Sequence, residues 1–310
     1  MIYVTQGHER GIGLEVFLKS ALLLDQASLS NLSLIASNQT LLQTLESLNL
    51  DFELGLNQLH FGGIDIKLIE IIPSKNKSES QLALDLGMKL CEENKGSILF
   101  NLPTSKDQLS GFAGHTEYFR HVYQNSSLPM FFYGPDYQIM LLSDHEPVAK
   151  LSPLLKENYI KEKILITVDS MKKWKLPLKR VLLSGFNPHA GENGLLGQEE
   201  EGLKKLLPKL RQKYTDLEFN GPIPADTMVF SHRDHNDLLV YWFHDQGLGV
   251  FKGHHGLIGA NITLGMPFLR LSVDHGTAFD LFGKNQADER GCYYVLKLAH
   301  EFSKRIENRG

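Results

Sequence analysis

The sequence is poor in cysteine, with Cys91 and Cys292 as the two examples in 310 residues. Two thiols cannot build a disulfide framework, and their scarcity fits a reducing compartment. Long apolar runs are also missing, so no segment is expected to cross a bilayer. Met1 leads directly into Ile2-Tyr3-Val4, without a basic or long apolar leader. We therefore expect a cytoplasmic protein without a membrane partner.

The chain also lacks a basic excess, because its formal net charge is −4. Proteins that bind nucleic acids usually carry such an excess, so we expect no nucleic-acid partner. Basic residues do gather at Lys172, Lys173 and Lys175, and this cluster is interpreted as a solvated face.

Several catalytic motifs are absent as well. There is no Walker A loop for phosphoryl transfer from ATP and no Gly-x-Ser-x-Gly turn, and neither cysteine stands in a nucleophile context. Gly11-Ile12-Gly13 invites comparison with the dinucleotide fingerprint, but the third glycine is missing. These absences disfavour kinases and serine or cysteine hydrolases.

The remaining composition is that of an ordinary globular protein, with 42% hydrophobic and 22% charged residues. Short β-rich runs alternate with amphipathic segments of helical length, which predicts an α/β fold. The expected strands are Ile2–Val4, Leu32–Ala36, Ile98–Leu102, Ile139–Leu142, Val181–Gly185, Leu238–Phe243 and Thr263–Val273. The expected helices are Leu14–Leu24, Gln198–Lys213 and Asp288–Glu307.

Three predicted strands are each followed by a histidine, namely His145, His189 and His244. In open α/β sheets, ligands bind at the carboxyl ends of the strands, so the three imidazoles are candidates for one divalent-metal site. The spacings match no local metal motif. Three unrelated histidines, each satisfied by a backbone partner, are the alternative interpretation.

A glycine-rich segment, residues 253–265, lies between Lys252 and Arg270. Glycines let backbone amides approach an anion, and the two cations supply charge, so the segment is a candidate phosphate or carboxylate site. A flexible loop with two surface cations is the alternative. Gly114-His115-Thr116-Glu117 is either another phosphate contact or a helix start capped by Thr116.

These segments together resemble one family, the 4-hydroxythreonine-4-phosphate dehydrogenases. The resemblance covers nearly the whole chain, and its Asn187–Glu192 block is highly specific. The matching segments are Gly114–Glu117, Ser143–Leu151, Leu183–Glu200, Asn220–Thr227, Phe243–Lys252 and Asn261–Ala278.

The resemblance implies the α/β/α architecture of isocitrate and isopropylmalate dehydrogenases, with residues 1–310 forming one enzyme unit of two lobes around a central cleft. It also implies a homodimer whose active site lies near the subunit interface, and NAD or NADP as the cofactor. The implied ligands of a divalent metal, such as zinc, magnesium or cobalt, are His145, His189 and His244. The implied substrate-binding residues are His115, Thr116, Lys252, Asn261 and Arg270.

The implied reaction oxidises 4-phosphohydroxy-L-threonine at C3 and then removes its carboxylate as carbon dioxide, which gives 3-amino-2-oxopropyl phosphate for vitamin B6 synthesis. Asp226 and Lys252 are both candidates for moving the proton.

The N-terminal signature departs from that of the family, because it reads Gly7-His8-Glu9-Arg10-Gly11-Ile12-Gly13-Leu14-Glu15 and lacks an aspartate and two prolines. Three alternatives therefore stay open: a dehydrogenase of phosphothreonate or phosphoerythronate, a non-catalytic paralogue that binds a phosphorylated ligand, and a three-histidine zinc hydrolase.

Overall fold

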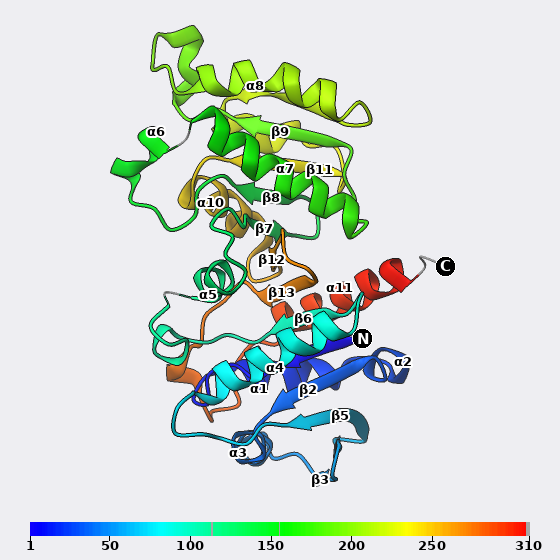
Figure 1. The fold of residues 1–310 in the computed structure, drawn as a ribbon. Helices are drawn as coiled ribbons and strands as arrows, with labels where there is room; N and C mark the ends of the chain where they lie inside the picture. Colours follow the sequence, from blue (N-terminus) through cyan, green and yellow to red (C-terminus); the bar gives the residue numbers. More distant parts are fainter. Residues whose placement is uncertain (113, 155, 308–310) are drawn as a thin grey trace. The chain divides into compact units, whose positions relative to one another are not determined.

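The computed structural model describes residues 1–112, 114–154 and 156–307. The chain forms two compact units (Figure 1). Unit 1 combines residues 1–125 with residues 266–310, and unit 2 is the continuous segment 126–265.

Unit 1 contains a mostly parallel sheet with the strand order β13-β6-β1-β2-β5-β4-β3. β13, β6, β1, β2 and β5 run parallel to one another, whereas β4 pairs antiparallel with both β5 and β3. The strands are β1 (Ile2–Thr5), β2 (Leu32–Ala36), β3 (Phe52–Leu54), β4 (Gln58–Phe61), β5 (Ile64–Glu70), β6 (Ile98–Asn101) and β13 (Leu269–Val273).

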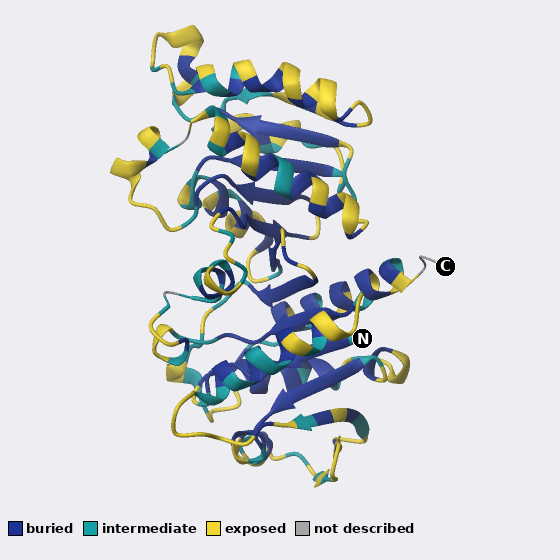
Figure 2. Ribbon diagram, in the orientation of Figure 1, coloured by how far each residue is buried: buried dark blue, intermediate teal, exposed yellow. Residues whose placement is uncertain are grey.

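The central strands of unit 1 are covered on both faces. Every residue of β1, β2, β6 and β13 is buried (Figure 2), and successive side chains of a strand point to opposite faces. The covering helices include α4 (Glu79–Glu93), which packs on β1, β2 and β6, and α11 (Arg290–Glu307), which packs on β13, β1 and β6. The other helices are α1 (Gly13–Ala21), α2 (Gln26–Leu29), α3 (Asn38–Ser47), α5 (His115–Val122), η1 (Lys106–Gln108) and η5 (Phe279–Leu281).

Local sequence explains where two of these helices begin. Ser37 precedes α3 and accepts a hydrogen bond from the Thr40 amide, and Ser78 precedes α4 and accepts one from the Gln81 amide. Such caps satisfy amide groups that the first turn leaves without a helical partner.

Unit 2 contains the strand order β10-β9-β11-β8-β7-β12. β8 to β11 pair in parallel, whereas β7 is antiparallel to both β8 and β12. The strands are β7 (Met130–Tyr133), β8 (Gln138–Leu141), β9 (Arg180–Ser184), β10 (Glu218–Ile223), β11 (Asp237–Tyr241) and β12 (Ala260–Thr263).

Helices also line the sheet of unit 2. α10 (His244–His255) packs on β8 and β11, and α8 (Glu200–Lys213) packs on β10 and α7 (Glu157–Lys173). The core here includes Phe132, Leu239 and Phe251. The shorter helices are α6 (Leu151–Leu154), α9 (Ala225–Met228), η2 (Val148–Lys150), η3 (Pro188–Gly194) and η4 (Val229–Ser231).

The predicted α/β class and most predicted strands are confirmed, with ends shifted by one or two residues. The predicted strand Thr263–Val273 is wrong in one respect, because it is two strands: β12 ends at Thr263 and β13 begins at Leu269. Gly265 lies between them with φ +89°, a conformation that interrupts a strand and favours glycine. The predicted helix Leu14–Leu24 also ends earlier, at Ala21.

The predicted solvated face at Lys172, Lys173 and Lys175 is confirmed, because all three residues are exposed. Among the described residues, no helix is both long and apolar enough to cross a membrane.

Candidate functional site

The three strands that precede the candidate metal ligands are neighbours in unit 2. The sheet order places β11 between β9 and β8, and the three strands are parallel. His145, His189 and His244 follow the carboxyl ends of β8, β9 and β11 respectively. The three histidines therefore lie beyond the same edge of one sheet, which is the arrangement expected from a histidine that follows each strand.

Two of these imidazoles lie close together. The rings of His145 and His244 have centroids 5.9 Å apart. Two imidazoles that share one ion, each with a bond of ~2.1 Å, have ring centroids roughly 5 to 6 Å apart. His145 is exposed and His244 is half-buried, and the Nδ1 atom of His244 lies 2.7 Å from the Asp245 carboxylate. The pair is accessible to a ligand from solvent.

His189 belongs to a loop with an unusual backbone. Residues 189–193 all have φ between +42° and +75°, and four of them are not glycine. Left-handed backbone costs L-residues about 1 kcal/mol or more each, so the surrounding contacts must hold it. Glu200 supplies such contacts, because its buried carboxylate accepts hydrogen bonds from the amides of Phe186 and Asn187 at 3.0 and 2.7 Å.

Gln246 and Trp242 join the carboxyl ends of β9 and β11. The Trp242 indole donates to the Ser184 carbonyl at 2.5 Å, and the Gln246 side chain donates to the Gly185 carbonyl at 3.0 Å. Gln246 also accepts a hydrogen bond from the Trp242 amide at 2.9 Å. Sequence reasoning missed this bracing role of Gln246, although its position beside His244 was a usable signal.

In unit 1, His115 and Arg270 meet around Asn101. The guanidinium of Arg270 donates to the Asn101 side-chain oxygen, and the Asn101 amide nitrogen lies 3.0 Å from Nδ1 of His115. Arg270 also lies over the Phe119 ring, 5.2 Å from its centroid. These contacts bring two of the predicted substrate-binding residues into one cluster, with Thr116 in the first turn of the same helix as His115.

Burial controls the charges in this cluster. Arg270 is 1% exposed, and desolvation lowers its pKa to about 9, so the guanidinium is still mainly charged at neutral pH. Burial, followed by repulsion from Arg270, holds the pKa of His115 well below 6.5. His115 is therefore neutral, and the cluster offers a buried cation that attracts an anion.

Two alternatives for these segments are wrong. Thr116 is not the cap of its helix, because Gly114 occupies that position without a side-chain hydrogen bond and Thr116 lies inside α5. Arg270 is not a surface cation but a buried residue of β13. The glycine-rich segment is also not one loop, because residues 253–255 end α10 and residues 260–263 form β12.

The other candidate residues are more dispersed. Asp226 lies in α9 and Lys252 in α10, and both are exposed. Asn261 is half-buried in β12, where it pairs with Phe132 of β7. All three belong to unit 2, whereas His115, Thr116 and Arg270 belong to unit 1.

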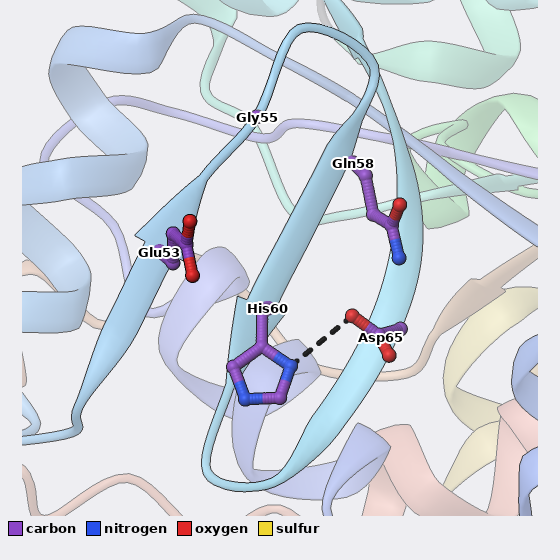
Figure 3. A pocket seen from close by; sticks show the side chains of 5 residues that line it. All are labelled: Glu53, Gly55, Gln58, His60 and Asp65. Carbon is purple, nitrogen blue, oxygen red and sulfur yellow. Dashed lines mark hydrogen bonds and ion pairs between the residues drawn. The ribbon is translucent and has the colours of Figure 1, made fainter.

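Two open pockets of unit 1 lie elsewhere. One, of about 410 Å³, is lined by His8 and Arg10 of the altered N-terminal signature together with Asp107, Phe279 and Phe282. The buried His8 ring packs edge-on against Phe279 with centroids 4.7 Å apart. The other, of about 310 Å³, lies on the β3-β4-β5 strands, where His60 and Asp65 approach to 3.1 Å (Figure 3).

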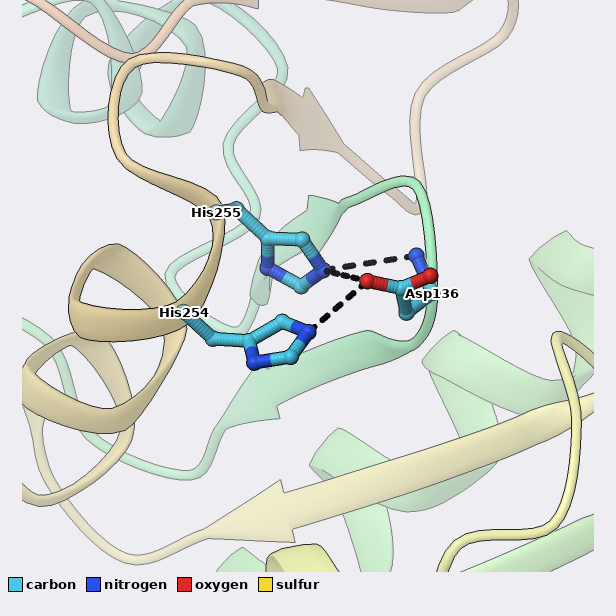
Figure 4. A group of neighbouring side chains, drawn as sticks. All are labelled: Asp136, His254 and His255. Atoms are coloured by element: carbon cyan, nitrogen blue, oxygen red, sulfur yellow. Dashed lines mark hydrogen bonds and ion pairs between the residues drawn. The ribbon is translucent and has the colours of Figure 1, made fainter.

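A further group was missed by sequence reasoning. Asp136, His254 and His255 each offer a ligand atom, and these atoms all lie within 4.8 Å of one another (Figure 4). The adjacent histidines were visible in the sequence, but their partner lies more than a hundred residues away along the chain.

Comparison with known proteins identifies the family. The model of the family described as pyridoxal phosphate biosynthetic protein PdxA matches residues 17–299. The chain belongs to this family. Its resemblance to 4-hydroxythreonine-4-phosphate dehydrogenases is thereby confirmed, and so is its assignment as a dehydrogenase connected with pyridoxal phosphate synthesis.

Several relatives match almost end to end. A 4-hydroxythreonine-4-phosphate dehydrogenase of Pseudoalteromonas translucida is 31% identical, with 97% of each chain covered. A putative D-threonate 4-phosphate dehydrogenase of Oceanobacillus iheyensis is 28% identical, with 98% of each covered.

Solved structures give the same result for the fold. The 4-hydroxythreonine-4-phosphate dehydrogenase of Klebsiella pneumoniae has a TM-score of 0.82 at 28% identity, and 98% of each chain is covered. An isocitrate dehydrogenase of Methylococcus capsulatus, at 13% identity and a TM-score of 0.51, shares the fold alone over 99% of this chain and 88% of its own. The predicted kinship of fold with isocitrate dehydrogenase is confirmed.

Proposed function

We propose that the chain carries out the metal-dependent, NAD- or NADP-linked oxidation of 4-phosphohydroxy-L-threonine at C3, followed by decarboxylation to 3-amino-2-oxopropyl phosphate. Membership of the PdxA family and the names of its full-length relatives support the reaction class. One observation supports an anionic substrate: Arg270 is buried, is hydrogen-bonded to Asn101 and lies beside a neutral His115. A phosphorylated hydroxy acid offers the anionic groups that such a cation binds.

The residues of unit 2 fit a divalent metal. His145, His189 and His244 offer nitrogen donors, which suit zinc or cobalt better than magnesium, and all three lie at least partly open to solvent. A metal bound there would act as a Lewis acid toward the substrate oxygen and lower the pKa of its hydroxyl. Glu200 and Gln246 would position the ligands, because their hydrogen bonds fix the segments beside His189 and His244.

The other proposed roles concern binding and proton movement. The residues proposed to bind the anionic substrate are Arg270, His115 and Thr116, together with Lys252 and Asn261. Asp226 or Lys252 would transfer the proton that the hydroxyl loses. Both side chains are exposed, which suits a group that must reach a bound substrate. We further propose that the enzyme works as a homodimer with the active site near the interface.

A second substrate deserves a direct test. The Oceanobacillus iheyensis relative, which is named for D-threonate 4-phosphate, covers 98% of this chain. The match to this relative favours D-threonate 4-phosphate as the alternative substrate.

The deciding experiment measures NADH formation from 4-phosphohydroxy-L-threonine, D-threonate 4-phosphate and D-erythronate 4-phosphate, with and without added divalent metal. We expect the highest kcat/KM for 4-phosphohydroxy-L-threonine and dependence on metal. A higher kcat/KM for another acid would make that acid the substrate and leave the proposed reaction class unchanged. Binding of all three without turnover would identify a non-catalytic paralogue, and turnover without NAD or NADP would identify a hydrolase.

A further inference from the structure

Asp136, His254 and His255 form a compact group of metal-ligating side chains in unit 2. Asp136 lies in the turn between β7 and β8, and the two histidines are the last residues of α10. One oxygen of Asp136 lies 2.7 Å from Nε2 of His254 and 3.6 Å from Nε2 of His255. Figure 4 shows both rings directed toward that carboxylate.

The surroundings hold the His255 ring in place. Its side chain is 1% exposed, and it packs against Tyr137 with ring centroids 4.6 Å apart. Gly134 allows the turn to close onto the ring, because a Cβ atom at this position would lie 2.6 Å from Cε1 of His255. The ring is therefore oriented before any ion arrives, which reduces the entropy lost on binding.

The nitrogen of His255 that faces Asp136 carries a lone pair. The amide of Asp136 donates a long hydrogen bond of 3.3 Å to Nε2 of His255, so this atom is the acceptor, and a bound ion would take its lone pair in place of the amide.

We propose that Asp136, His254 and His255 form a divalent-metal site that binds zinc or a similar transition ion, with water as the remaining ligand. Ligand atoms that share a tetrahedral zinc, with bonds of ~2.1 Å, lie about 3.4 Å apart. The two observed separations from the Asp136 oxygen, 2.7 and 3.6 Å, lie on either side of that value. Two imidazoles and one carboxylate suit zinc better than calcium or magnesium, which prefer oxygen.

This site is separate from the three histidines assigned to catalysis. His244 begins α10 and His254 and His255 end it, so a helix rise of 1.5 Å per residue separates them by about 15 Å. Asp136 also precedes β8, whereas His145 follows it. One group lies at the amino end of the strand and the other at its carboxyl end.

The expected role of the bound ion is structural. It would join the β7–β8 turn to the end of α10, the helix that carries Lys252 and begins at His244. Because the ion binds the folded chain and finds no assembled site in the unfolded one, it would raise the free energy of unfolding. This inference does not depend on which substrate the enzyme uses.

Zinc binding to the full-length, tag-free chain tests the proposal. Wild type, Asp136→Asn and His254→Gln are stripped with a chelator, dialysed against zinc alone and analysed for zinc per chain and for Tm. Both altered side chains are more than half exposed, 57% for Asp136 and 51% for His254, so the variants should fold. His60→Gln is the matched control, because His60 is also half-exposed and paired with an aspartate.

We expect wild type and His60→Gln to hold one more zinc ion per chain than the other two variants. In Asp136→Asn and His254→Gln, the affinity for that ion should fall by ~10-fold or more, and zinc should raise Tm by less. Equal zinc content in all four proteins would overturn the proposal. Loss of the ion from His60→Gln as well would also overturn it, because binding would then be unspecific.

Discussion

At the scale of single residues, Arg270 carries the clearest functional expectation. A lysine in its place could not keep both the hydrogen bond to Asn101 and the contact with the Phe119 ring, because an ammonium lacks the planar donor fork. We expect Arg270→Lys to lower kcat/KM by ~10-fold or more. The control is Arg305→Lys, which alters a half-buried partner of Glu301. Steady-state rates within a factor of two of wild type would remove Arg270 from the anion site.

His115 should make the stability of unit 1 sensitive to acid. Its pKa in the folded chain is lowered, first by burial and then by Arg270, so the unfolded chain binds the proton more readily. The contribution is complete above the unfolded pKa of ~6.5 and is lost as the pH falls below it. Urea unfolding from pH 7.5 to 5 should show a steeper loss in wild type than in His115→Gln, by up to about 1.4 kcal/mol per pH unit. Parallel curves for the two proteins would contradict this.

The η3 loop is an element whose shape depends on one carboxylate. Glu200 accepts hydrogen bonds from two consecutive amides beside His189, and bonds to a charged acceptor are stronger than neutral ones. Glu200→Gln should lower the free energy of unfolding by about 1–3 kcal/mol and reduce kcat, because His189 loses its support. Glu201→Gln, which removes an exposed partner of Lys204, should change neither quantity. Urea titrations and steady-state kinetics of the two variants make the comparison.

Two helical glycines differ in what surrounds them. A Cβ atom at Gly87 of α4 would lie 2.6 Å from the Thr5 side chain and 2.8 Å from that of Leu99, whereas one at Gly249 of α10 would meet nothing within 4 Å. We expect Gly87→Ala to destabilise the fold by about 1–3 kcal/mol through overpacking. Gly249→Ala should stabilise it by about 0.5–1 kcal/mol, because alanine favours a helix. Urea denaturation of both variants would detect the opposite signs.

Elements with a strong local signal were predictable, and those fixed by distant contacts were not. Continuous apolar runs marked β1, β2, β6, β9 and β11, because strands buried on both faces must be apolar throughout. The short strands β3 and β4 gave no such signal, since β3 is partly exposed and β4 alternates exposed and buried residues. The positions of His145 and His244 followed from strand polarity, whereas the Asp136 group required a turn and a helix end that lie 118 residues apart to meet.

At the scale of the whole molecule, each unit contributes a different part of the proposed chemistry. Unit 1 holds the cation and the neutral imidazole of the Asn101 cluster. Unit 2 holds both histidine groups, one at each end of α10. The family resemblance accounts for the residues at the carboxyl ends of the strands, and it assigns nothing to Asp136, His254 and His255.

The main functional prediction concerns His145, His189 and His244, which follow three strands at one edge of the sheet. Replacing any one of the three by alanine should weaken metal binding and abolish most NADH formation, because two imidazoles seldom hold a divalent ion at a catalytic position. Activity should also fall in acid, and excess metal should partly restore it, because metal and protons compete for the same nitrogens.

The measurement compares metal content and NADH formation for wild type and the three alanine variants, each after chelation and addition of metal. His254→Gln serves as the comparison, because His254 lies at the far end of α10 from His244. It should lose an ion and keep its turnover, whereas the three alanine variants should lose an ion together with their turnover. Full activity of chelated wild type, or wild-type rates in any alanine variant, would rule out catalysis by a metal held on these three histidines.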